Sequence, residues 1–214
     1  MTMRSNDLLL GFDAREMWMD FSQDWSEERK RSFLLRRDIV KPLSTDTTVW
    51  QSVFDVDQTL QRPQWIGPTG QLWENLPALE QYVSTAWNKR REPYWVIAIT
   101  LPADIASDEE RAYWNDRRGE IMPSVADPSW HLLGYDVADS YLLSGLTNLG
   151  YGDDEVQDIG PKYLPFLNEY HLFQSVEPAA EFIHRAEEGA RAHAPFFVFG
   201  LWLIKKEEGL AHPD

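Results

Sequence analysis

The stretch that decides the fold runs from Pro93 to Arg118 and reads PYWVIAITLPADIASDEERAYWNDRR. Residues 94–101 are apolar at nearly every position and rich in β-branched and aromatic side chains, which predicts a central strand covered on both faces. Ser107 and Glu110 then have the spacing of a capping box, which predicts a helix over residues 108–118.

The rest of the chain mixes strands and helices without a regular strand–helix–strand rhythm. Capping residues and apolar periodicity predict helices over about 26–37, 75–91 and 177–192, a short helix over 163–169, and strands over 48–56, 130–135 and 196–204. A further helix is expected to begin at Asp136 or Asp139 and to run through Leu146. We find no internal repeat, and we predict a single α+β domain over residues 1–214, with a mixed or largely antiparallel sheet covered by helices.

The composition excludes several classes of protein. The 214 residues include 20 Lys and Arg against 35 Asp and Glu, a net charge of −15, and proteins that hold nucleic acid or an anionic membrane by counter-charge need a basic surface instead. The chain has no cysteine, which excludes disulfides, thiolate metal sites and a cysteine nucleophile. The apolar run at residues 8–10 is too short for a signal peptide, so we expect a cytoplasmic protein.

The ten tryptophans are spread along the chain, and most are expected in the core, because an indole ring buries a large apolar area. Trp114 lies on a charged helix and could instead belong to an interface; we predict that it is buried.

The negative charge is concentrated in the second half of the chain. Between Arg118 and Lys162 there is no Lys or Arg, whereas this interval contains eight acidic residues: Glu120, Asp127, Asp136, Asp139, Asp153, Asp154, Glu155 and Asp158. Solubility is one explanation of such an excess. The other is a docking face for a cationic partner, whose association a complementary field would accelerate.

No motif assigns a reaction. In the glycine pair at residues 150–152, Glu155 stands where a dinucleotide-binding loop needs a third glycine. Glu181 and His184 share a helix face, but no second copy of the motif completes a di-metal site, so a polar surface pair is expected. Asp136 and Asp139 could perform general acid–base chemistry or could simply cap a helix. We therefore expect a non-enzymatic protein without metal or cofactor.

The segment 130–151, WHLLGYDVADSYLLSGLTNLGY, resembles a stretch in the immunity proteins that bacteria keep beside their secreted or contact-delivered toxins. The chain as a whole is also similar to such proteins, which are often small, acidic and free of cysteine. The resemblance implies a cytoplasmic inhibitor that binds and blocks a toxin, commonly a basic nuclease, in bacterial antagonism. It covers 22 residues and identifies no binding residue.

The leading hypothesis is therefore an immunity protein that neutralises a cognate toxin through an acidic surface. Its predicted contacts are Asp153, Asp154, Glu155 and Asp158, with Tyr151 as an aromatic anchor and Asp136 and Asp139 nearby. One alternative is a hydrolase or transferase with a carboxylate-based site formed by Asp136, Asp139 and His131. A second alternative is a DNA mimic that occupies nucleic-acid-binding proteins in general.

Overall fold

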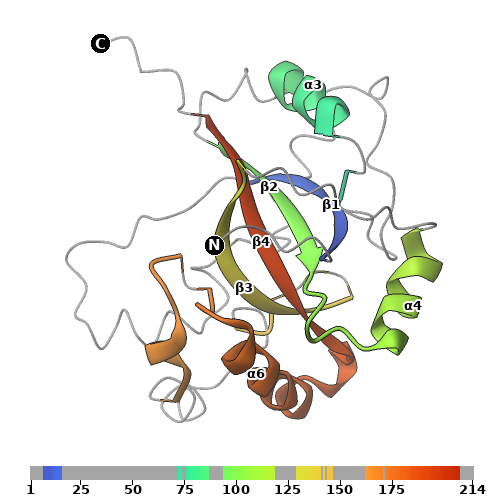
Figure 1. Ribbon diagram of the computed structural model, residues 1–214, viewed down its shortest axis with the longest axis vertical. Helices are drawn as coiled ribbons and strands as arrows, with labels where there is room; N and C mark the ends of the chain where they lie inside the picture. The colour runs from blue at the N-terminus through green and yellow to red at the C-terminus, as the bar shows by residue number, and fades with distance from the viewer. Residues whose placement is uncertain are drawn as a thin grey trace.

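The computed structural model describes residues 7–15, 72–73, 76–86, 94–118, 129–140, 142, 144–146, 162–170 and 172–207. Four antiparallel strands form one open sheet in the order β1-β2-β4-β3 (Figure 1). The strands are β1 (Leu8–Arg15), β2 (Tyr94–Leu101), β3 (His131–Asp139) and β4 (Phe196–Glu207). The named helices of the described residues are α3 (Leu76–Ala86), α4 (Asp108–Arg118) and α6 (Val176–Gly189). The α+β prediction is confirmed, and the sheet is wholly antiparallel.

The stretch 93–118 folds as its sequence predicts. β2 lies inside the sheet, between β1 and β4, and its side chains at residues 96–101 are buried. At the start of α4, the Glu110 amide donates to Ser107 Oγ at 3.1 Å and the Ser107 amide donates to Glu110 Oε2 at 2.6 Å, which is the reciprocal capping box.

The two faces of the sheet have different covers. Trp114 of α4 is fully buried against Phe197 and Phe199 of β4, with ring centroids 5.3 and 5.6 Å apart. The prediction that Trp114 is a core residue is confirmed. The other face carries α3 and α6, which lie towards opposite ends of the sheet in Figure 1. Leu79 of α3 joins a cluster with Ala98, and Phe182 of α6 joins one with Val198.

The sheet consists of two similar units, each with two antiparallel strands and one described helix, so the expectation of no internal repeat was wrong. The first unit is β1, α3 and β2, and the second is β3, α6 and β4. Residues 9–13 read LLGFD and residues 132–136 read LLGYD. Gly11 and Gly134 both adopt a positive φ, 158° and 147°, and each follows an irregularity in strand register. The next residue of each unit, Phe12 or Tyr135, pairs with Trp73 or Phe173 of its own unit.

The two units are related by an approximate twofold axis perpendicular to the sheet, between β2 and β4. Asp13 is paired with Ile97 on β2 as Asp136 is paired with Phe199 on β4. Across the centre, Ala98 is opposite Trp202 and Thr100 is opposite Gly200. In this register Thr100 and Trp202 occupy equivalent positions, and the Trp202 indole N–H donates to Thr100 Oγ1 at 3.0 Å. This bond therefore joins the two units at their centre.

The glycines of the repeat are required by close packing. A Cβ atom on Gly134 would lie 2.6 Å from Leu172 Cβ, and one on Gly11 would lie 2.8 Å from Leu72 Cβ. Only a residue without a Cβ fits both the positive φ and the approach of the neighbouring chain.

The segment after residue 135 differs from its prediction. β3 continues to Asp139 because residues 136–139 pair with residues 196–199 of β4. No helix begins at Asp136 or Asp139: Leu142 has a φ of 61° and Ser144 forms a bridge with Ala138. Strand pairing over buried apolar neighbours outweighs the capping preference of aspartate here.

The other predicted elements are confirmed with changed ends or lie outside the described residues. The helix expected over 177–192 ends at Gly189 and is followed by a 3-10 turn, η3 (Arg191–His193). The short helix expected over 163–169 ends earlier: Lys162 and Tyr163 are helical, and the 3-10 turn η2 (Leu164–Phe166) follows them. The elements expected over 26–37 and 48–56 lie outside the described residues. In the described part of the chain, no helix combines the length and apolarity needed to cross a membrane.

Candidate functional site

Asp136 and Asp139 are both on β3, and both are completely buried. This corrects the prediction that they stand beside the other acids on a partner-binding surface, because a carboxylate without solvent exposure cannot contact a docked protein. What each carboxylate holds in place is visible in its hydrogen bonds.

Asp136 fastens the segment that follows β3. Its Oδ1 accepts from the Val137 amide at 2.7 Å and from the Ser144 hydroxyl at 2.9 Å. Ser144 Oγ in turn accepts from the Leu146 amide at 3.2 Å, and the Gly145 amide donates to Val137 O at 2.6 Å. Residues 144–146 are thereby attached to the edge of β3. They immediately precede residues 147–161, which include the predicted acidic contact segment.

The second oxygen of Asp136 has a different environment. Oδ2 is buried and has no hydrogen-bond partner in the described part of the chain. Burial disfavours the charged carboxylate and raises its pKa from 3.8 to about 7, although the bonds from Ser144 and Val137 oppose the shift. In the folded protein the Asp136 carboxyl group therefore ionises near neutral pH.

Asp139 ties the end of β3 to η3. Its Oδ2 lies 2.8 Å from Nδ1 of His193, whose side chain is 44 % exposed. In a nucleophilic triad, a buried carboxylate orients an imidazole in the same way. Here the neighbouring hydroxyl of Ser144 donates to Asp136 and not to an imidazole. We therefore interpret the Asp139–His193 bond as structural: it connects the end of β3 to the chain that leads into β4.

The repeat indicates that the aspartate of the LLG(F/Y)D motif has a structural role. Asp13, the counterpart of Asp136, is likewise fully buried, and its Oδ1 accepts from the next amide, that of Ala14, at 2.8 Å. The backbone geometry after the glycine bulge explains why both units have an aspartate at this position. A functional role of Asp136 alone would not explain why Asp13 is also present.

The other predicted contacts, Tyr151, Asp153, Asp154, Glu155 and Asp158, lie outside the described residues and stay a prediction. His131 does not join the two aspartates: it is exposed at the start of β3, five positions before Asp136, which is about 16 Å along the strand. The carboxylate site expected for a hydrolase or transferase is therefore not assembled as predicted.

The candidate metal pair on α6 is part of the polar surface. Glu181 and His184 are both exposed, and Glu181 Oε1 lies 2.9 Å from Lys162 Nζ. This bond is the main reason that the pKa of Lys162 is raised to about 12. Among the described residues, no three His, Asp or Glu side chains are grouped in a way that could hold a metal ion.

The described surface carries more acid than base. Its exposed acidic residues are Glu80, Asp104, Asp108, Glu109, Asp116, Glu169, Glu177, Glu181 and Glu188, and its exposed basic residues are Lys162, Arg191, Lys205 and Lys206. Lys162 is paired with Glu181, and Lys206 lies over the ring of Trp95 at 4.1 Å from its centroid. The exposed excess therefore has the same sign as the net charge of the chain.

Sequence reasoning missed His193 and Ser144 as the partners of the two aspartates. Neither pairing has a local signal, because Asp139 and His193 are 54 residues apart. The repeated LLG(F/Y)D motif was the one available sign that Asp136 belongs to a backbone feature. The chain matches no family model, no curated protein and no solved structure.

Proposed function

We propose that this chain is a cytoplasmic bacterial immunity protein that binds a cognate toxin through an acidic surface and blocks it. The observation that carries the proposal is the excess of exposed acidic over basic side chains among the described residues, in a chain of net charge −15. A large excess of one sign of charge disfavours the compact state through self-repulsion, and a basic partner relieves that repulsion. A toxin that grips a polyanion supplies such a partner, because its active site is lined with Lys and Arg.

The contacts are assigned to residues 151–158, with Tyr151 as the aromatic anchor and Asp153, Asp154, Glu155 and Asp158 as the charged partners. Asp136 and Asp139 support this surface without touching the toxin. The Asp136–Ser144 bond fixes the chain at residue 144, a few residues before the predicted contacts begin.

Co-expression tests the proposal. The protein encoded beside this gene is expressed in a susceptible host with and without the chain, and growth and complex formation are measured. We expect growth to be restored and the two proteins to purify together. The proposal is wrong if the neighbouring product is toxic and the chain neither restores growth nor forms a complex with it. Competition with DNA for many unrelated basic proteins would instead support the DNA-mimic alternative.

A further inference from the structure

The chain that follows β3 returns along the outer edge of that strand. β3 is the last strand in the order β1-β2-β4-β3. The Leu142 amide donates to Asp139 O at 3.0 Å, and the Gly145 amide donates to Val137 O at 2.6 Å. A segment that a few hydrogen bonds hold at the edge of a sheet can open locally while the sheet itself stays folded.

Asp136 provides the side-chain contact that closes this segment. Its Oδ1 accepts from the Ser144 hydroxyl at 2.9 Å, and Ser144 Oγ accepts from the Leu146 amide at 3.2 Å. The same Oδ1 also accepts from the Val137 amide at 2.7 Å. Opening of residues 144–146 therefore removes one of these two donors and admits water to the carboxyl group.

The closed arrangement suits a neutral carboxyl group better than a charged one. Asp136 is completely buried, and its Oδ2 has no hydrogen-bond partner in the part of the chain that the structure describes. A neutral acid carries its proton on Oδ2 while Oδ1 keeps both hydrogen bonds. An ionised group instead places charge on a buried oxygen without a donor, which is costly, and access of water relieves that cost.

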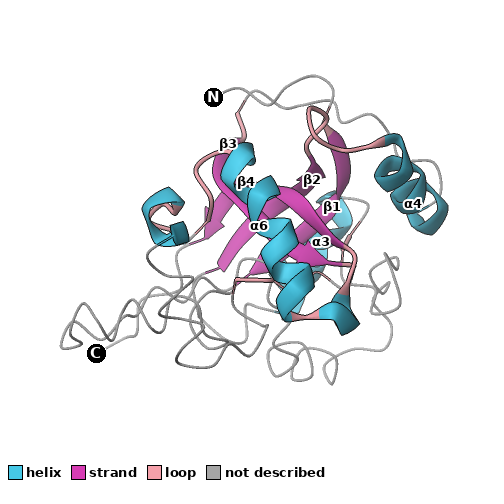
Figure 2. Cartoon of the chain, turned by 90° about the horizontal axis from the view of Figure 1, so that it is seen from below, coloured by secondary structure: helices cyan, strands magenta, loops and turns pink. Residues whose placement is uncertain are grey.

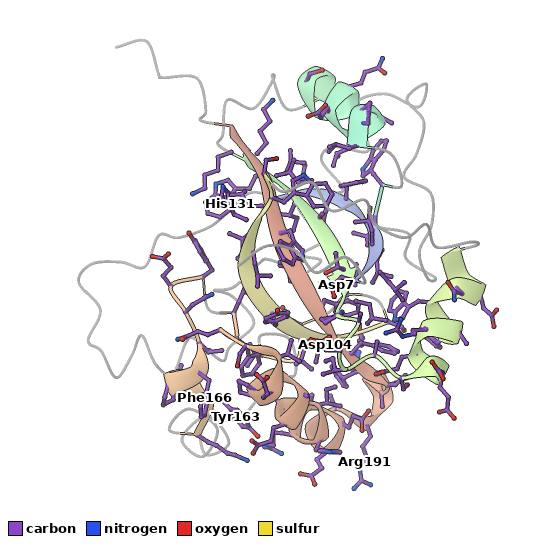
Figure 3. The ribbon with its side chains drawn as sticks, in the orientation of Figure 1. Asp7, Asp104, His131, Tyr163, Phe166 and Arg191 are labelled. Carbon is purple, nitrogen blue, oxygen red and sulfur yellow. The ribbon has the colours of Figure 1, made fainter. Side chains whose placement is uncertain are left out.

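The other titratable groups of β3 and η3 lie away from Asp136. Asp139 is three positions further along the strand, so its side chain, which is bonded to His193, lies on the other face of the sheet. Figure 3 places His131 at the far end of β3 and shows Arg191 of η3 pointing away from the sheet.

β4 and α4 present uncharged side chains to Asp136. Phe199 of β4 is directly opposite it in the strand register, and Trp114 of α4, which lies beside the sheet in Figure 2, packs against Phe199 at 5.6 Å. The described titratable groups of α4 have other surroundings: Asp108, Glu109 and Asp116 are exposed, Glu110 bonds to Ser107, Arg111 bonds to the carbonyl groups of residues 103 and 106, and Tyr113 lies against Phe197. Burial and the two hydrogen bonds to Oδ1 are the causes that shift the pKa of Asp136.

We propose that Asp136 is a proton-controlled latch: its protonated side chain holds residues 144–146 against the edge of β3, and loss of the proton to water releases them. The inference does not depend on the proposed function, because it concerns only the described residues around Asp136.

The expected size of the effect follows from proton linkage. The pKa of Asp136 is about 7 in the closed form, and water access in the open form returns it towards its ordinary value of 3.8. Opening therefore becomes about tenfold more frequent with each pH unit between these values and is constant above about pH 7. From pH 5.5 to 7.5 the increase amounts to about 20-fold.

Hydrogen exchange of backbone amides in the full-length chain, followed by NMR and corrected for the intrinsic exchange rate, measures this opening. The probes are the amides of Gly145 and Leu146. The reference amides are those of Tyr135 and Phe173, which donate to each other's carbonyl groups at 2.9 and 2.8 Å on the same edge of β3. Measurement in low concentrations of urea separates local opening from global unfolding, because a local opening exposes little surface.

We expect opening at Gly145 and Leu146 to increase about 20-fold from pH 5.5 to 7.5 and to be insensitive to low urea. Tyr135 and Phe173 should open at least about tenfold less often at pH 7.5, and their opening should increase with urea. If all four amides open equally often with the same urea dependence, the proton acts on global unfolding alone and the inference fails.

Two matched variants identify the responsible group. Asp136→Asn removes the titration, so opening at Gly145 and Leu146 should become independent of pH. Asp13→Asn changes the fully buried counterpart in the first unit and should leave that pH dependence in place. The inference is overturned if the wild type shows no pH dependence at these two amides, if Asp136→Asn retains it, or if Asp13→Asn abolishes it as well. Should Asp136→Asn not fold, the wild-type comparison of the four amides decides alone.

Discussion

Replacement of Asp136 by asparagine should stabilise the folded chain, and by an amount that depends on pH. The side chain is fully buried, Oδ2 has no described partner, and its pKa rises from 3.8 to about 7 on folding. Below pH 3.8 the carboxyl group is protonated in both states. Between pH 3.8 and about 7 the unfolded chain releases this proton while the folded chain retains it, so the free energy of unfolding falls as the pH rises.

The size of the effect follows from the shift. Each pH unit in this window costs about 1.4 kcal/mol, so the whole shift corresponds to about 4 kcal/mol. The isoelectric point near 4.7 makes the acid end of the window unsuitable, and urea unfolding is better measured from pH 5.5 to 8.5. Over this range the stability of Asp136→Asn relative to wild type should rise by about 2 kcal/mol up to pH 7 and then stay constant.

Asp139→Asn is the matched control, because Asp139 is on the same strand and is equally buried but is bonded to His193. This variant should be less stable than wild type, since it weakens the buried hydrogen bond to His193. A stability difference between Asp136→Asn and wild type that does not change with pH would refute the reasoning, because it would mean that Asp136 is already ionised in the folded protein at pH 5.5.

The remaining predictions concern the repeat and the core. Gly134→Ala and Gly11→Ala should each lower the free energy of unfolding by about 2–5 kcal/mol, because the added Cβ meets backbone and side-chain atoms at under 3 Å and φ is positive. The control is Gly189→Ala, at the exposed end of α6, which should cause no loss of stability. Equal stability of all three variants would contradict the assigned bulges. Trp114→Ala should cost about 3–5 kcal/mol in urea unfolding, because the ring is fully buried against Phe197 and Phe199; a loss below 1 kcal/mol would place α4 away from the sheet.

Local sequence patterns were enough to predict the helices and strands that neighbouring residues determine. The capping box of α4 is contained within four residues, and the apolar run of β2 identifies an interior strand without knowledge of its neighbours. In both cases the residues that decide the structure are close together in the sequence, so one stretch contains the whole argument.

The course of the chain after residue 135 could not be predicted in this way. Aspartate is a common N-cap residue, so either Asp136 or Asp139 could begin a helix, and only the pairing with residues 196–199 of β4 makes them strand residues. The acidic stretch between Arg118 and Lys162 was interpreted as one surface because charge can be counted from the sequence, whereas burial cannot. Two of its members are in the interior, and their partners Ser144 and His193 are brought to them by the fold.

The internal repeat was missed because it has no constant period. The equivalent residues Gly11 and Gly134 are 123 positions apart, Leu72 and Leu172 are 100 apart, and Ala98 and Gly200 are 102 apart. Insertions of different length between the elements hide a repeat from any search at a fixed spacing. The shared glycine bulge and the pairing around it make the correspondence visible in the structure.

The most direct test of the central claim is the rate at which this chain associates with the protein encoded by the neighbouring gene, measured over a range of salt concentrations. A variant with Lys at positions 153, 154 and 155 is compared with one that has Lys in place of Glu80, Asp116 and Glu188, which changes the net charge equally on three other parts of the surface. We predict fast association that slows with salt for wild type, a much slower and nearly salt-independent rate for the first variant, and a smaller change for the second. Equal slowing in both variants, or no slowing in either, would contradict a localised acidic docking surface.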